Sequence, residues 1–136
     1  MTSEDPIALG LPHREPFVFV DRLVSRVPGE SAECVKTFSA ETPFFAGHFP
    51  GAPLVPGVIL AEALAQTAGL AAGQPGRSFR LTAIKAMKFP AAAGPGEGIR
   101  LYARKVAVVG GLWQFEVRAS VGERTVADGV IVLNEA

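Results

Sequence analysis

The sequence is poor in the residues that bind metals or form disulfides. It contains one cysteine, Cys34, and two histidines, His13 and His48, among 136 residues. A lone cysteine can form neither a disulfide within the chain nor a cysteine-based zinc site. The spacing of the two histidines matches no recognisable set of metal ligands. We therefore expect no bound metal.

Charge is also scarce, and neither sign is in excess. The 13 basic and 13 acidic side chains give a formal net charge of zero, and charged residues make up only 19% of the chain. A protein whose main partner is a nucleic acid needs an excess of Lys and Arg to displace counterions. The composition therefore argues against nucleic acid as the main partner.

Long apolar runs are missing as well. The longest, Val58–Gly73, has about 16 residues and would measure roughly 24 Å as a helix. That length falls short of a bilayer, and the run contains the carboxylate of Glu62. The first ten residues are acidic and broken by Pro6, so they lack the basic-then-apolar order of an export signal and read as a loose tail. We expect a soluble cytoplasmic protein that does not insert into membranes.

Apolar residues are abundant, at 49% of the chain. They suffice to fill the core of one globular domain over residues 1–136. Apolar residues occupy every side of Val58–Gly73, which predicts a buried helix that ends at Gly73 and Pro75-Gly76. Segments rich in β-branched and aromatic residues, separated by glycine turns such as Gly110-Gly111, predict six strands: Phe17–Val27, Glu30–Ser39, Phe79–Phe89, Ile99–Val109, Leu112–Val121 and Arg124–Leu133.

The order of these elements predicts an α+β fold. Two strands precede the helix and four follow it, and a lone buried helix must be wrapped by the sheet. A curved antiparallel sheet wrapped around one central helix is the hot-dog fold. One such domain leaves one side of the helix and sheet poorly covered, so we expect at least a dimer.

Residues 40–57 form an unusual connection between the second strand and the helix. They hold four prolines and three glycines, a composition that excludes a regular strand or helix. The segment is nevertheless rich in phenylalanine, leucine and valine, which is far too apolar for a floppy linker. Long loops in small domains are often functional, so we expect this one to be ordered and packed.

Two titratable residues in this region need an explanation. A carboxyl placed in apolar surroundings, as predicted for Glu62, stays protonated and can donate a proton. Alternatively, Glu62 and Gln66 lie one turn apart and form a polar stripe that faces water or bonds internally. His48, held in the proline-rich loop, suits a general base near neutral pH. Its alternative is a structural histidine that bonds loop carbonyls.

A third group lies at the start of the helix. The N–H groups of a first helical turn lack internal partners and carry positive dipole character. Gly57 has no side chain to block a ligand, so its N–H can stabilise a developing enolate. Alternatively, Pro56-Gly57 only begins the helix, and the proline sets the angle at which the chain enters it. A base, an acid and an oxyanion donor together suit β-elimination of water from a 3-hydroxyacyl compound, or its reverse.

Two stretches of the sequence match a known family pattern: LPHREPFVFVDR (11–22) and PFFAGHFPGAPLVPGVILAEALAQTAG (43–69). The chain resembles the 3-hydroxyacyl-acyl-carrier-protein dehydratases of type II fatty-acid synthesis over nearly its whole length. The resemblance implies that His48 is the catalytic base, that Glu62 is the acid, and that the Gly57 N–H binds the thioester carbonyl. Glutamate at position 62 is typical of the branch that only dehydrates.

The resemblance also implies the substrate and the assembly. The substrate is a (3R)-3-hydroxyacyl thioester, the product a trans-2-enoyl thioester, and the setting fatty-acid or polyketide-like acyl-chain biosynthesis. Phe49, Val58 and Gln66 are assigned to substrate binding. No cofactor is expected beyond the phosphopantetheine that carries the substrate on acyl carrier protein. The hot-dog homodimer, or an oligomer built from it, takes His48 and Glu62 of each site from different subunits.

Basic residues on neighbouring predicted strands bear on the carrier protein, which is acidic. They either form a basic patch near the pantetheine entrance or belong to ordinary solvated strand faces: Lys85, Lys88, Arg100, Arg104 and Lys105.

Two other functions stay open at this point. One is a hot-dog acyl thioesterase, in which Glu62 activates water. The other is a non-catalytic acyl-thioester binding module. His13 and Arg14 belong to the LPHREPF string and are interpreted as structural, with Arg14 pairing with Asp21 or Glu15.

Overall fold

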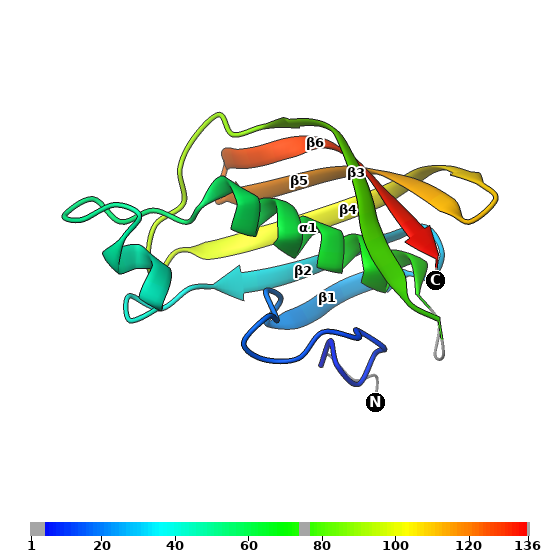
Figure 1. The fold of residues 1–136 in the computed structure, drawn as a ribbon, viewed down its shortest axis with the longest axis horizontal. Coiled ribbons are helices and arrows are strands. Elements are labelled where there is room, and N and C mark those ends of the chain that lie inside the picture. Colours follow the sequence, from blue (N-terminus) through cyan, green and yellow to red (C-terminus); the bar gives the residue numbers. More distant parts are fainter. Residues whose placement is uncertain (1–4, 74–76, 136) are drawn as a thin grey trace.

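The computed structural model describes residues 5–73 and 77–135. A single antiparallel sheet of six strands packs one face against one long helix (Figure 1). The strand order in the sheet is β1-β2-β4-β5-β6-β3. In chain order the elements are β1 Arg22–Val27, β2 Ser31–Thr37, a 3₁₀ turn Pro43–Ala46, α1 Gly57–Ala72, β3 Phe79–Lys88, β4 Gly98–Val109, β5 Leu112–Val121 and β6 Arg124–Glu135.

The helix is buried as its composition predicts. Leu64, Ala68 and Ala71 in α1 are fully buried. They pack in one core with Leu101 of β4 and Phe115 of β5. Because α1 contacts β2, β3, β4, β5 and β6, the sheet wraps around it. The predicted hot-dog arrangement is confirmed.

Apart from the first strand, the helix and strand boundaries lie close to those expected from the sequence. Gly73 follows α1 directly, and its N–H donates to the carbonyl of Gly69. The predicted turn at Pro75-Gly76 lies outside the described residues. Within residues 5–73 and 77–135, no helix is long and apolar enough to cross a membrane.

The N-terminal region differs from its prediction in two ways. Residues 5–11 are not a loose tail: the N–H groups of Leu9 and Leu11 donate to the carbonyls of Asp5 and Pro6 at 3.0 Å, and Leu11 is buried in the core. The first strand begins at Arg22 rather than Phe17. Residues 11–19, here called the strap, instead lie over α1.

The loop before α1 is ordered, as expected, but it contains one short helical turn. The 3₁₀ turn Pro43–Ala46 has proline at its first position, where no N–H is needed. Phe45 in this turn is buried, and the N–H of Val55 donates to the carbonyl of Ala93 at 2.8 Å. The loop is therefore fastened to the chain on both sides of His48.

Strand β3 forms one edge of the sheet. It pairs with β6 on one side only, with irregularities between Leu81 and Ala83 and between Ile84 and Ala86. Leu81 is 37% exposed and Ile84 is 48% exposed. The described chain thus ends its sheet on a strand that carries apolar side chains into solvent.

We predict that Gly129→Ala disturbs this edge. A Cβ at Gly129 of β6 would lie 2.0 Å from the carbonyl oxygen of Ala86, so the backbone of β3 must move. Overpacking of this kind costs about 1–3 kcal/mol of unfolding free energy. Urea unfolding measures it. Gly98→Ala is the matched control, because its nearest atom would lie at an ordinary 3.9 Å; equal stability of the two variants would contradict the prediction.

A second prediction concerns Cys34, which is buried in β2. Burial raises the pKa of the Cys34 thiol from an ordinary 9.0 to about 11, with Glu33 adding to the rise and a hydrogen bond with Thr67 opposing it. Between these values the unfolded chain ionises and the folded chain does not. Stability is therefore unaffected by this thiol below pH 9.0 and falls as pH rises toward about 11.

The loss amounts to about 2–3 kcal/mol for a shift of this size. Unfolding of the native chain and of Cys34→Ala, measured at several pH values, isolates the contribution. Parallel stability curves for the two proteins between these pH values would show that the thiol ionises equally well in the folded chain.

Candidate active site

His48 is held by the loop that carries it. Its Nδ1 lies 3.2 Å from the carbonyl oxygen of Leu54, and the Leu54 N–H donates to the His48 carbonyl at 3.0 Å. The Phe49 ring stacks on the imidazole with a centroid distance of 4.1 Å. A proton on Nδ1, donated to Leu54, leaves a lone pair on Nε2. The loop carbonyl bond and the role of a base are thus compatible.

The start of α1 provides a backbone donor. The Gly57 N–H has no acceptor within the part of the chain that the structure describes. A Cβ at Gly57 would meet the Phe89 ring at 3.0–3.2 Å, so the ring of Phe89 packs directly on the glycine. A side chain at position 57 would have to displace the Phe89 ring. Val58, the next residue, is 76% exposed.

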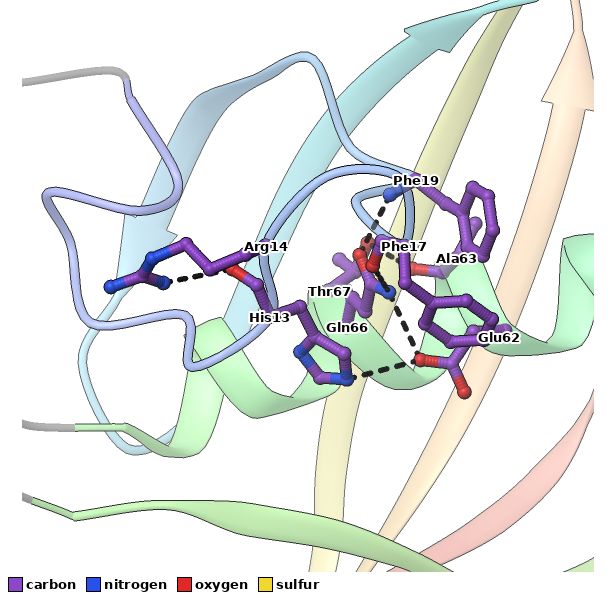
Figure 2. A network of polar contacts seen from close by, with 8 residues as sticks. All are labelled: His13, Arg14, Phe17, Phe19, Glu62, Ala63, Gln66 and Thr67. Carbon is purple, nitrogen blue, oxygen red and sulfur yellow. Dashed lines mark hydrogen bonds and ion pairs between the residues drawn. The ribbon is translucent and has the colours of Figure 1, made fainter. Parts of the chain in front are cut away.

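Glu62 lies in a polar network rather than alone among apolar groups (Figure 2). Its Oε2 accepts a hydrogen bond from Gln66 Nε2 at 3.0 Å and lies 3.3 Å from His13 Nε2. The Glu62 side chain is 19% exposed. The bond between Glu62 and Gln66 that the sequence suggested is therefore present, and His13 joins it.

The Gln66 amide connects the helix to the strap. It is 1% exposed, and its Oε1 accepts the Phe19 N–H at 2.9 Å. Its Nε2 donates to the Phe17 carbonyl at 3.1 Å as well as to Glu62. Every polar atom of this amide is thus bound within the chain.

Within the described residues, Arg14 pairs with no carboxylate, contrary to the sequence prediction. Its Nη1 donates to the carbonyls of Leu11 at 2.9 Å and His13 at 2.8 Å. Asp21 instead binds Lys36 Nζ at 3.0 Å and the Thr37 N–H at 2.8 Å, because it precedes β1 beside the end of β2. Arg14 therefore shapes the strap through its backbone.

A groove opens beside Glu62. Its volume is about 510 Å³, and it lies between the strap, α1, the start of β3 and the end of β6. Its polar lining comprises His13, Glu62, Ser78 and Arg80, and its apolar lining includes Ala65, Phe79, Leu81 and Leu133. A carboxyl at one side of an apolar groove suits a ligand with a polar group and a hydrocarbon chain.

The structure brings the predicted site residues together in two groups. Gln66 and Glu62 meet at the groove, whereas His48, Phe49 and Gly57 belong to the loop and the helix start. Among residues 5–73 and 77–135, no hydrogen bond or ion pair joins His48 to Glu62. Sequence reasoning missed His13 as a neighbour of Glu62; its only signal was the LPHREPF string.

Three of the five basic strand residues pair with carboxylates, and Lys88, Arg100 and Arg104 line the same surface groove. Arg100 pairs with Glu33 at 2.7 Å, Arg104 pairs with Glu116, and Lys105 lies 3.5 Å from Glu30. The paired cations match ordinary solvated strand faces. In the part of the chain that is described, no group of three or more His, Cys, Asp and Glu side chains is arranged to hold a metal ion.

Comparisons with known proteins identify relatives over most of the chain. A family model for ApeI-like dehydratases matches residues 24–130. A 3-hydroxyacyl-[acyl-carrier-protein] dehydratase, FabZ, of Ruminiclostridium cellulolyticum is 41% identical over 125 residues, which cover 89% of this chain and 88% of the relative. The FabZ of Nitratidesulfovibrio vulgaris (strain DP4) is 38% identical and covers 89% of this chain and 82% of its own.

Two solved structures share the fold at low sequence identity. The dehydratase heterocomplex ApeI:P from Xenorhabdus doucetiae has a TM-score of 0.80 and 18% identity, covering 96% of this chain and 91% of that chain. The fluoroacetyl-CoA thioesterase FlK has a TM-score of 0.68 and 16% identity, covering 83% and 90%. At these identities the likeness concerns the fold alone.

The network around Glu62 yields a stability prediction. Gln66→Met keeps the length of the side chain but leaves the Phe19 N–H without its acceptor. An unsatisfied buried donor costs about 1–3 kcal/mol, so thermal unfolding occurs at lower temperature. Gln114→Met is the control, because it removes only a surface bond from Lys85. Identical melting temperatures for both variants would show that the strap does not depend on Gln66.

Proposed function

Because this chain belongs to the 3-hydroxyacyl-[acyl-carrier-protein] dehydratase family, we propose that it eliminates water from (3R)-3-hydroxyacyl thioesters on acyl carrier protein. The product is the trans-2-enoyl thioester, made in fatty-acid or polyketide-like acyl-chain biosynthesis. The observation that carries this proposal is the Glu62 carboxyl at the wall of an otherwise largely apolar groove. An acyl chain fits such a groove with its 3-hydroxyl next to an acid.

Each predicted residue has one task in the elimination. His48 Nε2 takes the proton from the carbon next to the thioester carbonyl. The Gly57 N–H donates to the carbonyl oxygen as negative charge develops there. Glu62 gives its proton to the 3-hydroxyl, the carbon–oxygen bond breaks, and water leaves as the double bond forms. His48 gains one proton and Glu62 loses one, so solvent exchange restores the starting state.

The acid and the base of one site come from two copies of the chain in this proposal. No hydrogen bond or ion pair joins His48 to Glu62 within the described residues of one protomer, and the edge strand β3 is unpaired on one side. Leu81, Ile84 and Phe89 expose apolar surface along or just after β3. A second copy that covers this edge through a two-fold axis builds two equal sites, each with Glu62 of one protomer and His48 of the other.

The reaction sets the remaining requirements. Elimination of water involves no net oxidation or reduction. Side chains that transfer protons therefore suffice, and the enzyme needs no cofactor of its own. The substrate arrives on the phosphopantetheine arm of the carrier protein. Phe49 and Val58 are exposed near the helix start and are proposed to contact it. Gln66 is proposed to serve the substrate through the Glu62 carboxyl that it binds.

The test of the catalytic roles uses purified protein and 3-hydroxyacyl thioesters of several chain lengths. His48→Ala and Glu62→Gln each lower the rate of enoyl formation, followed by absorbance, by about 100-fold or more, because each removes a proton-transfer group. Glu123→Gln, an exposed turn substitution, is the matched control. Wild-type turnover in either site variant, or release of free thiol without enoyl product, would overturn the proposal.

Mixing the two inactive variants tests the shared site. A dimer of one His48→Ala chain and one Glu62→Gln chain contains one site with both native groups and one with neither. Random exchange of chains therefore restores about a quarter of wild-type activity for a two-fold dimer. No recovery after verified exchange would show that each chain uses its own His48 and Glu62.

A further inference from the structure

The Glu62 carboxyl receives its two side-chain donors on one oxygen. Gln66 Nε2 and His13 Nε2 both approach Oε2, at 3.0 Å and 3.3 Å. Figure 2 shows Oε1 pointing away from both nitrogens, and Oε1 has no partner within residues 5–73 and 77–135. An O–H on Oε2 would confront two N–H groups. A proton on this carboxyl therefore belongs on Oε1.

The other ring nitrogen of His13 indicates which tautomer makes this contact. Nδ1 is buried and has no hydrogen-bond partner in the part of the chain that the structure describes. An N–H buried without an acceptor loses its hydration with no compensation, so the ring proton favours Nε2, where Glu62 accepts it. Because this bond goes to Oε2 alone, it persists whether or not Oε1 carries a proton.

The strap fixes the place of His13. Arg14 Nη1 donates to the His13 carbonyl, and the Phe17 ring stacks beside the imidazole at a centroid distance of 6.1 Å and an angle of 22°. The carbonyl of Phe17 is itself bound by Gln66. The two donors to Oε2 thus come from different elements, the strap and α1. A carboxyl held by one hydrogen bond can still rotate about its terminal bond, whereas two donors from different directions fix its orientation.

We propose that His13 is a positioning residue for the dehydration: it holds Oε2 so that Oε1 faces the groove as the oxygen that delivers the proton. This inference rests on the proposed function, in which Glu62 is the acid. In the step itself the proton leaves Oε1 for the departing hydroxyl, the carbon–oxygen bonding pair goes to that oxygen, and the carboxylate remains bound through Oε2 to Gln66 and His13.

Two substitutions separate the donor from the ring. His13→Phe keeps an aromatic ring beside Phe17 and removes the N–H. His13→Gln loses the ring but places an amide N–H at the reach of Nε2. Glu15→Gln, an exposed change in the same strap, is the control. All are assayed in the full-length protein for kcat, KM, oligomeric state and thermal unfolding.

His13→Phe lowers kcat by about 10- to 100-fold, the effect of one lost hydrogen bond to a charged group, and leaves KM within about twofold. His13→Gln restores at least about tenfold of that loss. A structural role in folding alone would not produce this recovery, since the smaller amide packs less well than the phenyl ring.

Several results would overturn the inference while the proposed function stands. They are native kcat in His13→Phe, equal losses in His13→Phe and His13→Gln when both are folded, and a loss confined to KM. In each case Glu62→Gln stays inactive. If Glu62→Gln itself retains turnover, the proposed function fails, and the role of His13 fails with it. The double variant His13→Phe/Glu62→Gln is no slower than Glu62→Gln alone if His13 acts through Glu62.

Discussion

The hydrogen bonds of one buried amide hold the candidate site together. Gln66 lies on a helix whose only other polar side chains are Glu62 and Thr67, so its buried amide depends on Glu62 and on partners outside the helix. It finds them in the backbone of Phe17 and Phe19 and in the Glu62 carboxyl. The same bonds that satisfy the amide place the strap over α1 and fix the position of the carboxyl.

The rest of the fold serves this arrangement. The sheet wraps around α1 and excludes water from most of the helix, which leaves Glu62 at the border between the core and the groove. The glycine that begins the helix is covered by the Phe89 ring, and its N–H has no acceptor among the residues that the structure describes. In the proposed site, the acid Glu62 and the backbone donor Gly57 belong to α1, and the base His48 belongs to the loop before it.

The sequence predicted the regular elements well because their signals are local. The apolar helix begins at Gly57 rather than Val58, and the turn at Gly110-Gly111 joins β4 to β5 as expected. Prediction failed where side chains bind distant backbone. Residues 17–20 are β-branched or aromatic, yet Gln66, 47 and 49 positions away in sequence, takes the hydrogen bonds of Phe19 and Phe17 that a strand would have used.

The same limit applied to the site. The motif and the family resemblance predict His48, Gly57 and Glu62 as site residues, but no periodic signal in the sequence predicts the contact of His13 with Glu62. The prediction for Arg14 is wrong because a guanidinium also binds carbonyl oxygens. The backbone of the strap places the carbonyls of Leu11 and His13 within hydrogen-bond distance of Arg14 Nη1.

The open side of β3 has a consequence for how the chain behaves among other proteins. A free strand edge presents unpaired backbone N–H and C=O groups, and any extended peptide can pair with them. Repeated pairing of this kind leads to fibrous aggregates. β3 carries Arg80, Lys85 and Lys88 and is interrupted by two irregularities, and native edges use such features to discourage unintended pairing. In a crowded solution, β3 therefore pairs more readily with a strand of complementary charge and matching irregularities than with a regular, uncharged strand.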